Sequence, residues 1–182
     1  DPDASHRYFL AVIFPHQAMR ILDYNRVVRD LNGSTPETLL RDIAERFAVS
    51  PAASPVRPAG ARDFGMYLDG QWSLLQARPG SFDANDAIKS LDVSILQDNL
   101  LAPVLGIEDP RRDKRIDFVG GIRGTAELER RVRHDGWSVA FALHPVTMEQ
   151  LMKVADAGQV MPPKSTWFEP KLRSGLFVRP LS

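Results

Sequence analysis

Short apolar runs and capped helical stretches alternate along the second half of the sequence. An apolar run at residues 116–119 precedes a helical pattern at 126–134, which follows a capping hydroxyl at Thr125. A second apolar run at residues 137–143 precedes another helical pattern, which begins at Thr147. Strands that alternate with helices predict an α+β fold in which helices pack on a mixed β-sheet, and they argue against an all-β sandwich.

The first half mixes the two kinds of signal. Residues 8–14 form a continuous apolar run that predicts a buried central strand, and residues 19–24 predict a second strand. Apolar spacing predicts a helix at residues 25–31 and another at 34–47, which opens on a hydroxyl, a proline and a glutamate. The following stretch is rich in proline and glycine, so it predicts a flexible loop at residues 50–63.

An Asp-Gly pair lies at the centre of the clearest local signal. Alternating apolar residues at 64–68 and 71–77 flank the pair at 69–70. Asp-Gly favours a two-residue turn because both turn positions need positive φ, so the sequence predicts a β-hairpin. Further along the chain, apolar spacing predicts a long helix at residues 92–105 and a last strand at residues 175–178.

Size and composition fit one globular domain. The chain has 182 residues, of which 43% are hydrophobic and 25% are charged, so we expect a single α+β domain over residues 1–182. The sequence begins without a methionine and almost directly on a strand-like run. We therefore expect it to be a fragment of a longer protein or a processed chain.

Charge and cysteine content restrict the function. Lys plus Arg and Asp plus Glu each total 23, and a net charge of zero argues against a protein that coats nucleic acid. The sequence has no cysteine, which excludes disulfides and thiolate metal sites and fits a cytoplasmic protein. Apolar runs stay well short of the ~18 residues of a membrane span, so we expect no membrane partner.

A glycine-rich turn joins the strand at residues 116–119 to the next helix. Gly120, Gly121 and Gly124 leave backbone N–H groups open, and Arg123 adds a cation beside the positive end of the helix. This arrangement predicts an anion or phosphate cradle, although the spacing is not that of a dinucleotide fingerprint. The alternative is a tight strand-to-helix connection in which glycine only supplies backbone freedom.

The segment at residues 160–181 crowds charged and hydroxyl groups into irregular backbone, where binding sites often lie. Five of its side chains are candidates to bind an anion: Lys164, Ser165, Thr166, Lys171 and Arg173. The glycine loop of a P-loop is absent, so a Walker site is excluded. A looser phosphate or carboxylate site remains, and its alternative is a polar loop that prolines hold in place.

Two other groups of polar residues allow a functional or a structural interpretation, and we favour the structural one for both. Residues 23–26, Asp-Tyr-Asn-Arg, either face a cleft or form a turn and a helix cap. Gln97, Asp98 and Asn99 interrupt the long apolar helix and either lie on its solvent side or reach a buried partner. The four histidines lack metal-ligand spacing, so no metal site is predicted.

Three blocks of the sequence resemble one known family. They are LDYNRVVRDLNG at residues 22–33, SLDVSILQDNLLAPVLGIEDPRRDKRIDFVGGIRG at 90–124, and VMPPKSTWFEPKLRSGL at 160–176. On these blocks the chain resembles the second half of the bacterial and archaeal family called domain of unknown function 1015. Longer members carry an N-terminal region with an Asp-Gly-His-His-Arg motif, and this region is similar to ParB and sulfiredoxin-like proteins. The motif is absent from this sequence, where His6-Arg7-Tyr8 matches only part of it.

The resemblance implies a function, because the ParB-like group includes DNA partition proteins and a free-serine kinase. We expect this chain to be part of a cytoplasmic enzyme that binds a small phosphorylated or carboxylated metabolite, with a nucleotide as cofactor. A small-molecule kinase of the ParB-like type is the specific hypothesis. Two other classes stay open: a regulatory or nucleic-acid-binding module, and a structural domain that forms a homodimer.

Overall fold

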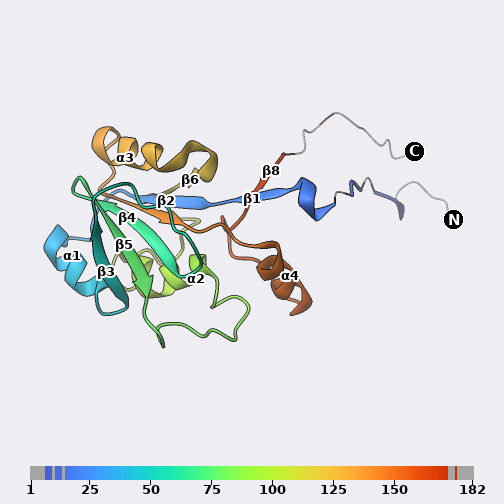
Figure 1. The fold of residues 1–182 in the computed structure, drawn as a ribbon, viewed down its shortest axis with the longest axis horizontal. Coiled ribbons are helices and arrows are strands. Elements are labelled where there is room, and N and C mark those ends of the chain that lie inside the picture. The colour runs from blue at the N-terminus through green and yellow to red at the C-terminus, as the bar shows by residue number, and fades with distance from the viewer. Residues whose placement is uncertain (1–6, 10, 14, 172–174, 176–182) are drawn as a thin grey trace. The chain divides into compact units, whose positions relative to one another are not determined.

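The computed structural model describes residues 7–9, 11–13, 15–171 and 175 of the chain (Figure 1). The chain divides into two compact units, one made of residues 1–20 and 168–182 and the other of residues 21–167. The smaller unit contains a short 3-10 helix, η2 (His16–Ala18). The larger unit contains the main sheet, and it holds every feature of the candidate site described below.

Six strands form the main sheet. They are β2 (Tyr24–Val28), β3 (Phe47–Ala52), β4 (Asp63–Leu68), β5 (Gln71–Ala77), β6 (Ile116–Gly120) and β7 (Val139–Leu143). Their order across the sheet is β3-β5-β4-β7-β2-β6, and every neighbouring pair runs antiparallel. β2 is therefore a central strand that pairs with β7 on one side and β6 on the other. Two further strands, β1 (Arg20–Leu22) and β8 (Trp167–Glu169), form a separate two-stranded sheet.

Four α-helices lie within the described residues: α1 (Pro36–Ile43), α2 (Asp92–Leu96), α3 (Gly124–His134) and α4 (Met148–Asp156). The predicted cap of α1 is confirmed, because Thr35 Oγ1 accepts a hydrogen bond from the backbone N–H of Thr38 at 3.3 Å. Thr147 and Gln150 form a capping box at the start of α4. In the part of the chain that the structure describes, no helix has the length and apolar character needed to cross a bilayer.

Helices cover both faces of the main sheet, which confirms the predicted α+β class. Residues alternate between the two faces along each strand, so Val28 joins one buried cluster and its neighbour Val27 joins the other. The first cluster packs against α1, α2 and α4, and the second against α3. In Figure 1, α3 lies on one side of the sheet and α2 on the other.

The predicted helix at residues 25–31 is wrong, because β2 occupies most of this stretch. β2 is buried on both faces, so consecutive residues such as Val27 and Val28 are both apolar. A strand buried on both sides loses the simple polar–apolar alternation, and its pattern can then resemble helical spacing. β-branched valines at these positions were the signal that favoured a strand.

The apolar run at residues 8–14 is not a buried strand where the structure describes it. Phe9 and Ile13 are 84% and 93% exposed, and none of the described residues of the run belongs to a strand. A strand becomes stable only when neighbours bond its backbone, and apolar composition alone does not supply a neighbour. The predicted strand at residues 175–178 lies outside the described residues apart from Gly175.

The hairpin predicted around the Asp-Gly pair is confirmed. β4 and β5 pair in antiparallel register, and the turn residues Asp69 and Gly70 have φ angles of 48° and 78°. The loop predicted before this hairpin is shorter than expected, because β3 extends to Ala52. The irregular part of that loop covers residues 53–62.

The helix predicted at residues 92–105 changes form after one turn. α2 ends at Leu96, and a π-helical turn, η3 (Gln97–Leu101), follows it. The backbone N–H of Ala102 donates to the carbonyl of Gln97 at 3.0 Å, five residues back, as in a π-helix. Such turns often occur beside functional sites, and this one lines a hollow described below.

Candidate anion site

The two segments predicted to bind an anion meet where β2 begins and β6 ends. Gly120 is the register partner of Tyr24, and the indole ring of Trp167 packs against the same glycine. A Cβ atom on Gly120 would lie 2.6 Å from Trp167 Cε3, so only glycine lets the indole come this close. We call this group of residues the Tyr24 cluster: Asp23, Tyr24, Gly120, Gly121, Lys164 and Trp167.

The carboxylate of Asp23 lies against Gly121. The backbone N–H of Gly121 donates to the backbone carbonyl of Asp23 at 2.8 Å, and a Cβ atom on Gly121 would overlap the Asp23 carboxylate. Asn25 Nδ2 donates a hydrogen bond to the same carboxylate. Glycine at position 121 is therefore needed for the close approach of Asp23, and the Asp23 carboxylate repels an anion near this turn.

Arg123 and Gly124 lie at the start of α3. Gly124 has a φ of 66°, in the region that favours glycine. Arg123 Nη1 is 3.5 Å from Glu127 Oε1, and the Arg123 side chain is 61% exposed. Hydrogen bonds from Arg130 above all, and from Arg131, lower the pKa of Glu127 to about 2. Arg123 is thus part of an ion-pair network on the surface of α3.

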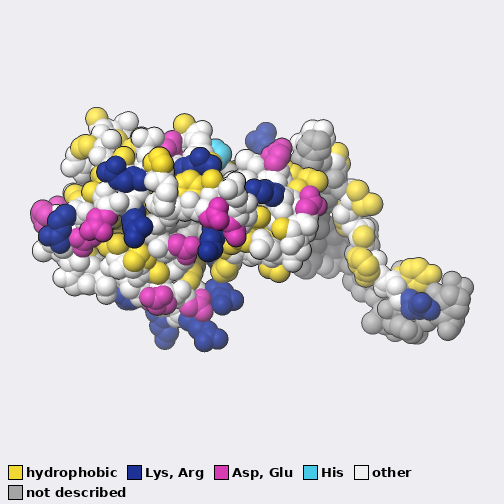
Figure 2. All heavy atoms as spheres, turned by 90° about the horizontal axis from the view of Figure 1, so that it is seen from below, with side chains coloured by type: hydrophobic (Ala, Val, Ile, Leu, Met, Phe, Trp, Pro, Cys, Tyr) yellow, Lys and Arg dark blue, Asp and Glu magenta, His cyan; other side chains and the backbone are white. Residues whose placement is uncertain are grey.

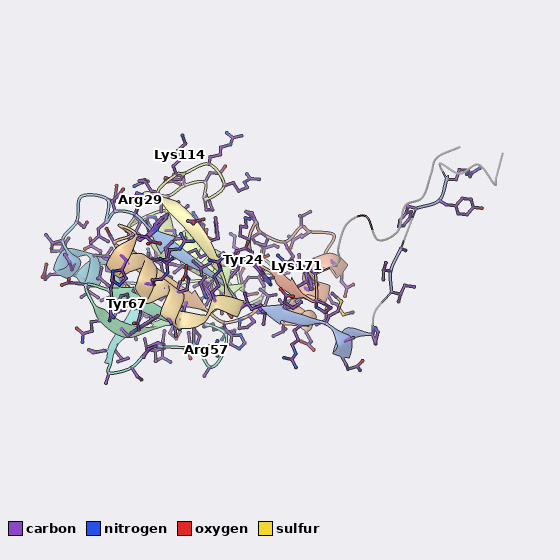
Figure 3. The ribbon with its side chains drawn as sticks, turned by 90° about the horizontal axis from the view of Figure 1, so that it is seen from above. Tyr24, Arg29, Arg57, Tyr67, Lys114 and Lys171 are labelled. Atoms are coloured by element: carbon purple, nitrogen blue, oxygen red, sulfur yellow. The ribbon has the colours of Figure 1, made fainter. Side chains whose placement is uncertain are left out.

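The ammonium of Lys164 lies over two aromatic rings. Its Nζ is 5.4 Å from the ring centre of Tyr24, 5.8 Å from that of Phe118 and 3.4 Å from Tyr24 Oη. Such contacts with ring faces stabilise a cation. Lys164 has a φ of 57°, which is uncommon for a residue other than glycine. Tyr24, which holds this side chain, is labelled in Figure 3.

The other predicted residues of the segment are placed differently. Ser165 is buried and Thr166 is half-buried. Lys171 belongs to the smaller unit, and Arg173 lies outside the described residues. The anion-binding role of all these residues stays a prediction.

Arg26 is a buried cation on an otherwise apolar face of the sheet. Its register partners are Phe118 on β6 and Phe141 on β7, and it is only 4% exposed. Nη2 donates a hydrogen bond to the backbone carbonyl of Lys164 at 3.1 Å, and Nη1 donates to the carbonyl of Tyr24. Burial lowers the pKa of Arg26 to about 10, because a charged group loses its hydration there.

No described carboxylate forms a salt bridge with Arg26. A guanidinium has five N–H donors, and its bonds to two neutral carbonyls leave the charge uncompensated. A buried cation without an acidic partner is costly, and such groups gather at functional sites. The sequence left two interpretations of residues 23–26 open, a group that faces a cleft and a turn with a helix cap, and the favoured turn did not indicate a buried cation. Assigning β2 as a strand puts Arg26 on the same face as Val28, where a charge is unexpected.

A hollow of about 740 Å³ opens beside Arg26, and we call it the Arg26 hollow. Its volume lies within the range of about 300–1,000 Å³ that is usual for small-molecule sites. Phe118 of β6, the prolines at 162–163 and the π-helical turn contribute to its wall. Lys164 and the glycines of the 120–124 turn do not line it. Arg26 connects the two places, because it lines the hollow and its guanidinium donates a hydrogen bond to the carbonyl of Lys164.

Charges of both signs surround the Arg26 hollow. The loop at residues 108–111 forms part of the wall, and Lys114 stands out from the same loop in Figure 3. Arg111 Nε lies 3.2 Å from Asp109 Oδ1. On the face seen in Figure 2, basic and acidic side chains are interspersed over the larger unit, and no broad basic surface appears there.

Asp92 is a second buried charged group, and it lies outside the lining of the hollow. Its Oδ1 accepts a hydrogen bond from the backbone N–H of Arg62 at 2.8 Å, which joins α2 to the residue before β4. Burial raises the pKa of Asp92 to about 6. No group of three or more metal-ligating side chains occurs among the described residues.

The fold and the site define an α+β protein that carries a buried, unpaired cation beside a hollow large enough for a small ligand. A family model described as "Protein of unknown function (DUF1015)" matches residues 1–94, and the chain belongs to this family. This finding confirms the family resemblance seen in the sequence. The relation to ParB-like proteins stays a prediction. No curated protein sequence matches the chain.

Solved structures share the fold at low sequence identity. A conserved hypothetical protein from Pyrococcus furiosus aligns with a TM-score of 0.51 and 12% identity, over 84% of this chain and 56% of its own. A mutant free serine kinase in complex with AMP aligns with a TM-score of 0.50 and 13% identity, over 84% and 55% of the two chains. At such identities the likeness shows the fold alone. This chain spans little more than half the length of either structure.

Proposed function

We propose that the chain forms the anion-binding part of an enzyme that acts on a small phosphorylated or carboxylated metabolite. A small-molecule kinase is the specific activity that we propose, with a nucleotide as cofactor. The likeness in fold to a free serine kinase that binds AMP supports this choice. The cytoplasmic location stays a prediction from the cysteine-free sequence.

The buried position of Arg26 is the observation that carries the proposal. Its charge forms no salt bridge with a described carboxylate, and Arg26 is one of the residues that line a hollow of ligand size. A planar guanidinium binds phosphate and carboxylate groups through paired N–H donors. An anion in the hollow would therefore supply the missing opposite charge without any change in the sheet.

The segments predicted from the sequence contribute around this centre. The backbone carbonyl of Lys164 accepts a hydrogen bond from Arg26, and Ser165 and Thr166 follow with hydroxyl groups. Gly120 lets Trp167, the next residue of this segment, pack closely against β6. We propose that the 164–166 segment responds when an anion reaches Arg26, because the two share a hydrogen bond. Arg123 and Gly124 do not line the hollow, and Arg123 pairs with Glu127.

Calorimetry of the purified chain with AMP, ADP, ATP and inorganic phosphate tests the proposal. We expect binding of at least one nucleotide at millimolar concentration or below. Arg26→Met should weaken it by about tenfold or more, which corresponds to the loss of one charge-assisted hydrogen bond. Lys164→Ala should weaken it less, because its ammonium does not line the hollow.

The matched control is Arg41→Ala, which removes an exposed arginine of α1 that pairs with Asp42. It should bind as the wild type does. The proposal fails for this chain if no anion binds at millimolar concentration, or if a folded Arg26→Met chain binds as tightly as the wild type. Circular dichroism of each variant separates a loss of binding from a loss of fold.

A further inference from the structure

The charges of the side chains that line the Arg26 hollow sum to zero, but only some of these side chains pair with each other. Three basic and three acidic side chains line it: Arg26, Lys89, Arg111, Asp98, Glu108 and Asp109. Arg111 and Asp109 neutralise each other, since their atoms lie 3.2 Å apart. Arg26 and Lys89 have no salt bridge to a described residue, and neither do Asp98 and Glu108. The hollow therefore presents two positive and two negative charges that no salt bridge of the described residues neutralises, and Lys89 also attracts the carboxylate of Asp86.

The two free positive charges match one phosphate group. A phosphate monoester carries a charge of about −1.5 to −2 near neutral pH. Arg26 is buried and fixed within a central strand, whereas Lys89 is exposed and has a flexible side chain. A rigid guanidinium and an adaptable ammonium that line the same hollow can together neutralise such a dianion.

The two free carboxylates oppose any further negative charge. Asp98 lies on the π-helical turn and Glu108 on the loop before β6, and both are exposed at the hollow. A second or third phosphate in the hollow would approach these groups and be repelled. Hydroxyl or amino groups of a ligand would instead find hydrogen-bond acceptors there.

Much of the remaining wall is apolar. Val93 and Leu101 come from the helical side, Phe118 from β6, and Met161 and Pro162 from the segment before Lys164. An inorganic ion would leave this surface wet, so a ligand with an apolar or aromatic body fits better. The hollow is thus complementary to a molecule with one charged end and a larger uncharged body.

We infer that the Arg26 hollow binds an amphipathic phosphate monoester, such as a nucleoside monophosphate, and discriminates against polyphosphates. The single phosphate lies at Arg26 and Lys89, the uncharged body contacts Phe118 and the 160–163 segment, and donor groups of that body face Asp98 and Glu108. This inference rests on the proposed anion-binding function and adds the class of ligand. In a kinase, the hollow would then hold a monophosphate product and not the polyphosphate donor.

Competition among four probes on the whole chain tests it: AMP, ATP, adenosine and inorganic phosphate. We expect AMP to bind about tenfold or more tightly than each of the other three. Adenosine lacks the phosphate, inorganic phosphate lacks the uncharged body, and ATP adds negative charge that Asp98 and Glu108 repel. The double variant Asp98→Asn, Glu108→Gln should bind ATP more tightly than the wild type does. The difference in affinity between AMP and ATP should therefore be smaller in this variant. Lys89→Gln should weaken AMP and leave adenosine unchanged.

Glu37→Gln is the control, because it removes an exposed carboxylate of α1 that does not line the hollow. It should leave the ratio of AMP to ATP affinity as in the wild type. Equal or tighter binding of ATP by the wild type overturns the inference and leaves the proposed function standing. Binding of inorganic phosphate as tightly as AMP also overturns it. The absence of any binding overturns both.

Discussion

Arg26 Nη2 donates a hydrogen bond to the backbone carbonyl of Lys164 at 3.1 Å, across 138 positions of the sequence. The bond joins a central strand of the sheet to the irregular segment that the sequence singles out for its lysine and hydroxyls. It also joins the Arg26 hollow to the Tyr24 cluster. Four predictions test the contacts of Arg26, Gly120 and Gly121 and the pH dependence that the buried Asp92 confers.

Arg26→Met should fold and lose only a modest amount of stability. The substitution removes an uncompensated buried charge, which favours the variant, but it leaves the carbonyls of Tyr24 and Lys164 without their partner. We expect a net loss of about 1–3 kcal/mol in the free energy of unfolding. Urea denaturation measures it, and a loss above about 4 kcal/mol would show that Arg26 has a mainly structural role.

Gly120→Ala should destabilise the chain and disturb Trp167. The added methyl would lie 2.6 Å from the indole ring, so the ring must move. We expect a loss of about 1–3 kcal/mol together with a shift in tryptophan fluorescence. Gly60→Ala is the control, because a Cβ atom there meets nothing within 4 Å, and it should change stability by less than about 1 kcal/mol. Equal stability of the two variants would contradict the packing described here.

The effect of Gly121→Ala should depend on Asp23. In the wild-type background the new methyl overlaps the Asp23 carboxylate, whereas in an Asp23→Ala background the space is free. A double-mutant cycle by urea denaturation should give a coupling energy of about 0.5–3 kcal/mol between the two positions. A coupling energy near zero would mean that the carboxylate does not lie against Gly121 in solution.

Asp92 should make the chain less stable as the pH rises. Its pKa is raised from 3.8 to about 6 by burial, so the folded state favours the protonated form. The stabilising contribution of this group is fully present below pH ~4 and is lost as the pH rises through about 6. At pH 7.5 the charged form costs on the order of 2–3 kcal/mol.

Asp92→Asn tests this pH dependence, because the amide oxygen can still accept the hydrogen bond from Arg62. The variant should be more stable than the wild type at pH 7.5, and the difference should shrink toward pH 4.5. Urea denaturation at a series of pH values measures it. Asp69→Asn, in an exposed turn, provides the comparison and should show no such trend. A wild type that is more stable than Asp92→Asn at pH 7.5 would refute the assignment.

Local signals in the sequence predicted those features whose form depends on residues close by along the chain. The Asp69-Gly70 turn and the caps Thr35 and Thr147 appear where they were expected, because each acts within a few residues of chain. β2 and the π-helical turn were missed, because each depends on packing that the local pattern does not contain. The exposure of Phe9 and Ile13 was missed for the same reason.

The candidate site was predicted in part. The sequence indicated the 120–124 turn and the 164–166 segment, and the structure brings Gly120 and Lys164 into one cluster. Arg26 was considered only within the group at residues 23–26, for which a structural role was favoured, because its significance depends on burial. A single arginine in YNRVV looks like a surface residue until β7 is placed on one side of it and β6 on the other.

The central position of β2 has a consequence for how any ligand would be received. Pairing with β6 and β7 fixes the backbone of Arg26, and hydrogen bonds to the carbonyls of Tyr24 and Lys164 hold its guanidinium, so the charge cannot swing toward an arriving molecule as that of a surface arginine does. The cation is held in place before binding, and little side-chain entropy is left to lose. Adjustment must come from the residues opposite, in the 160–163 segment, which no strand or helix restrains. The fixed position of Arg26 would thus set the affinity of the hollow for a ligand, and movement of the 160–163 segment would set the rate at which the ligand leaves.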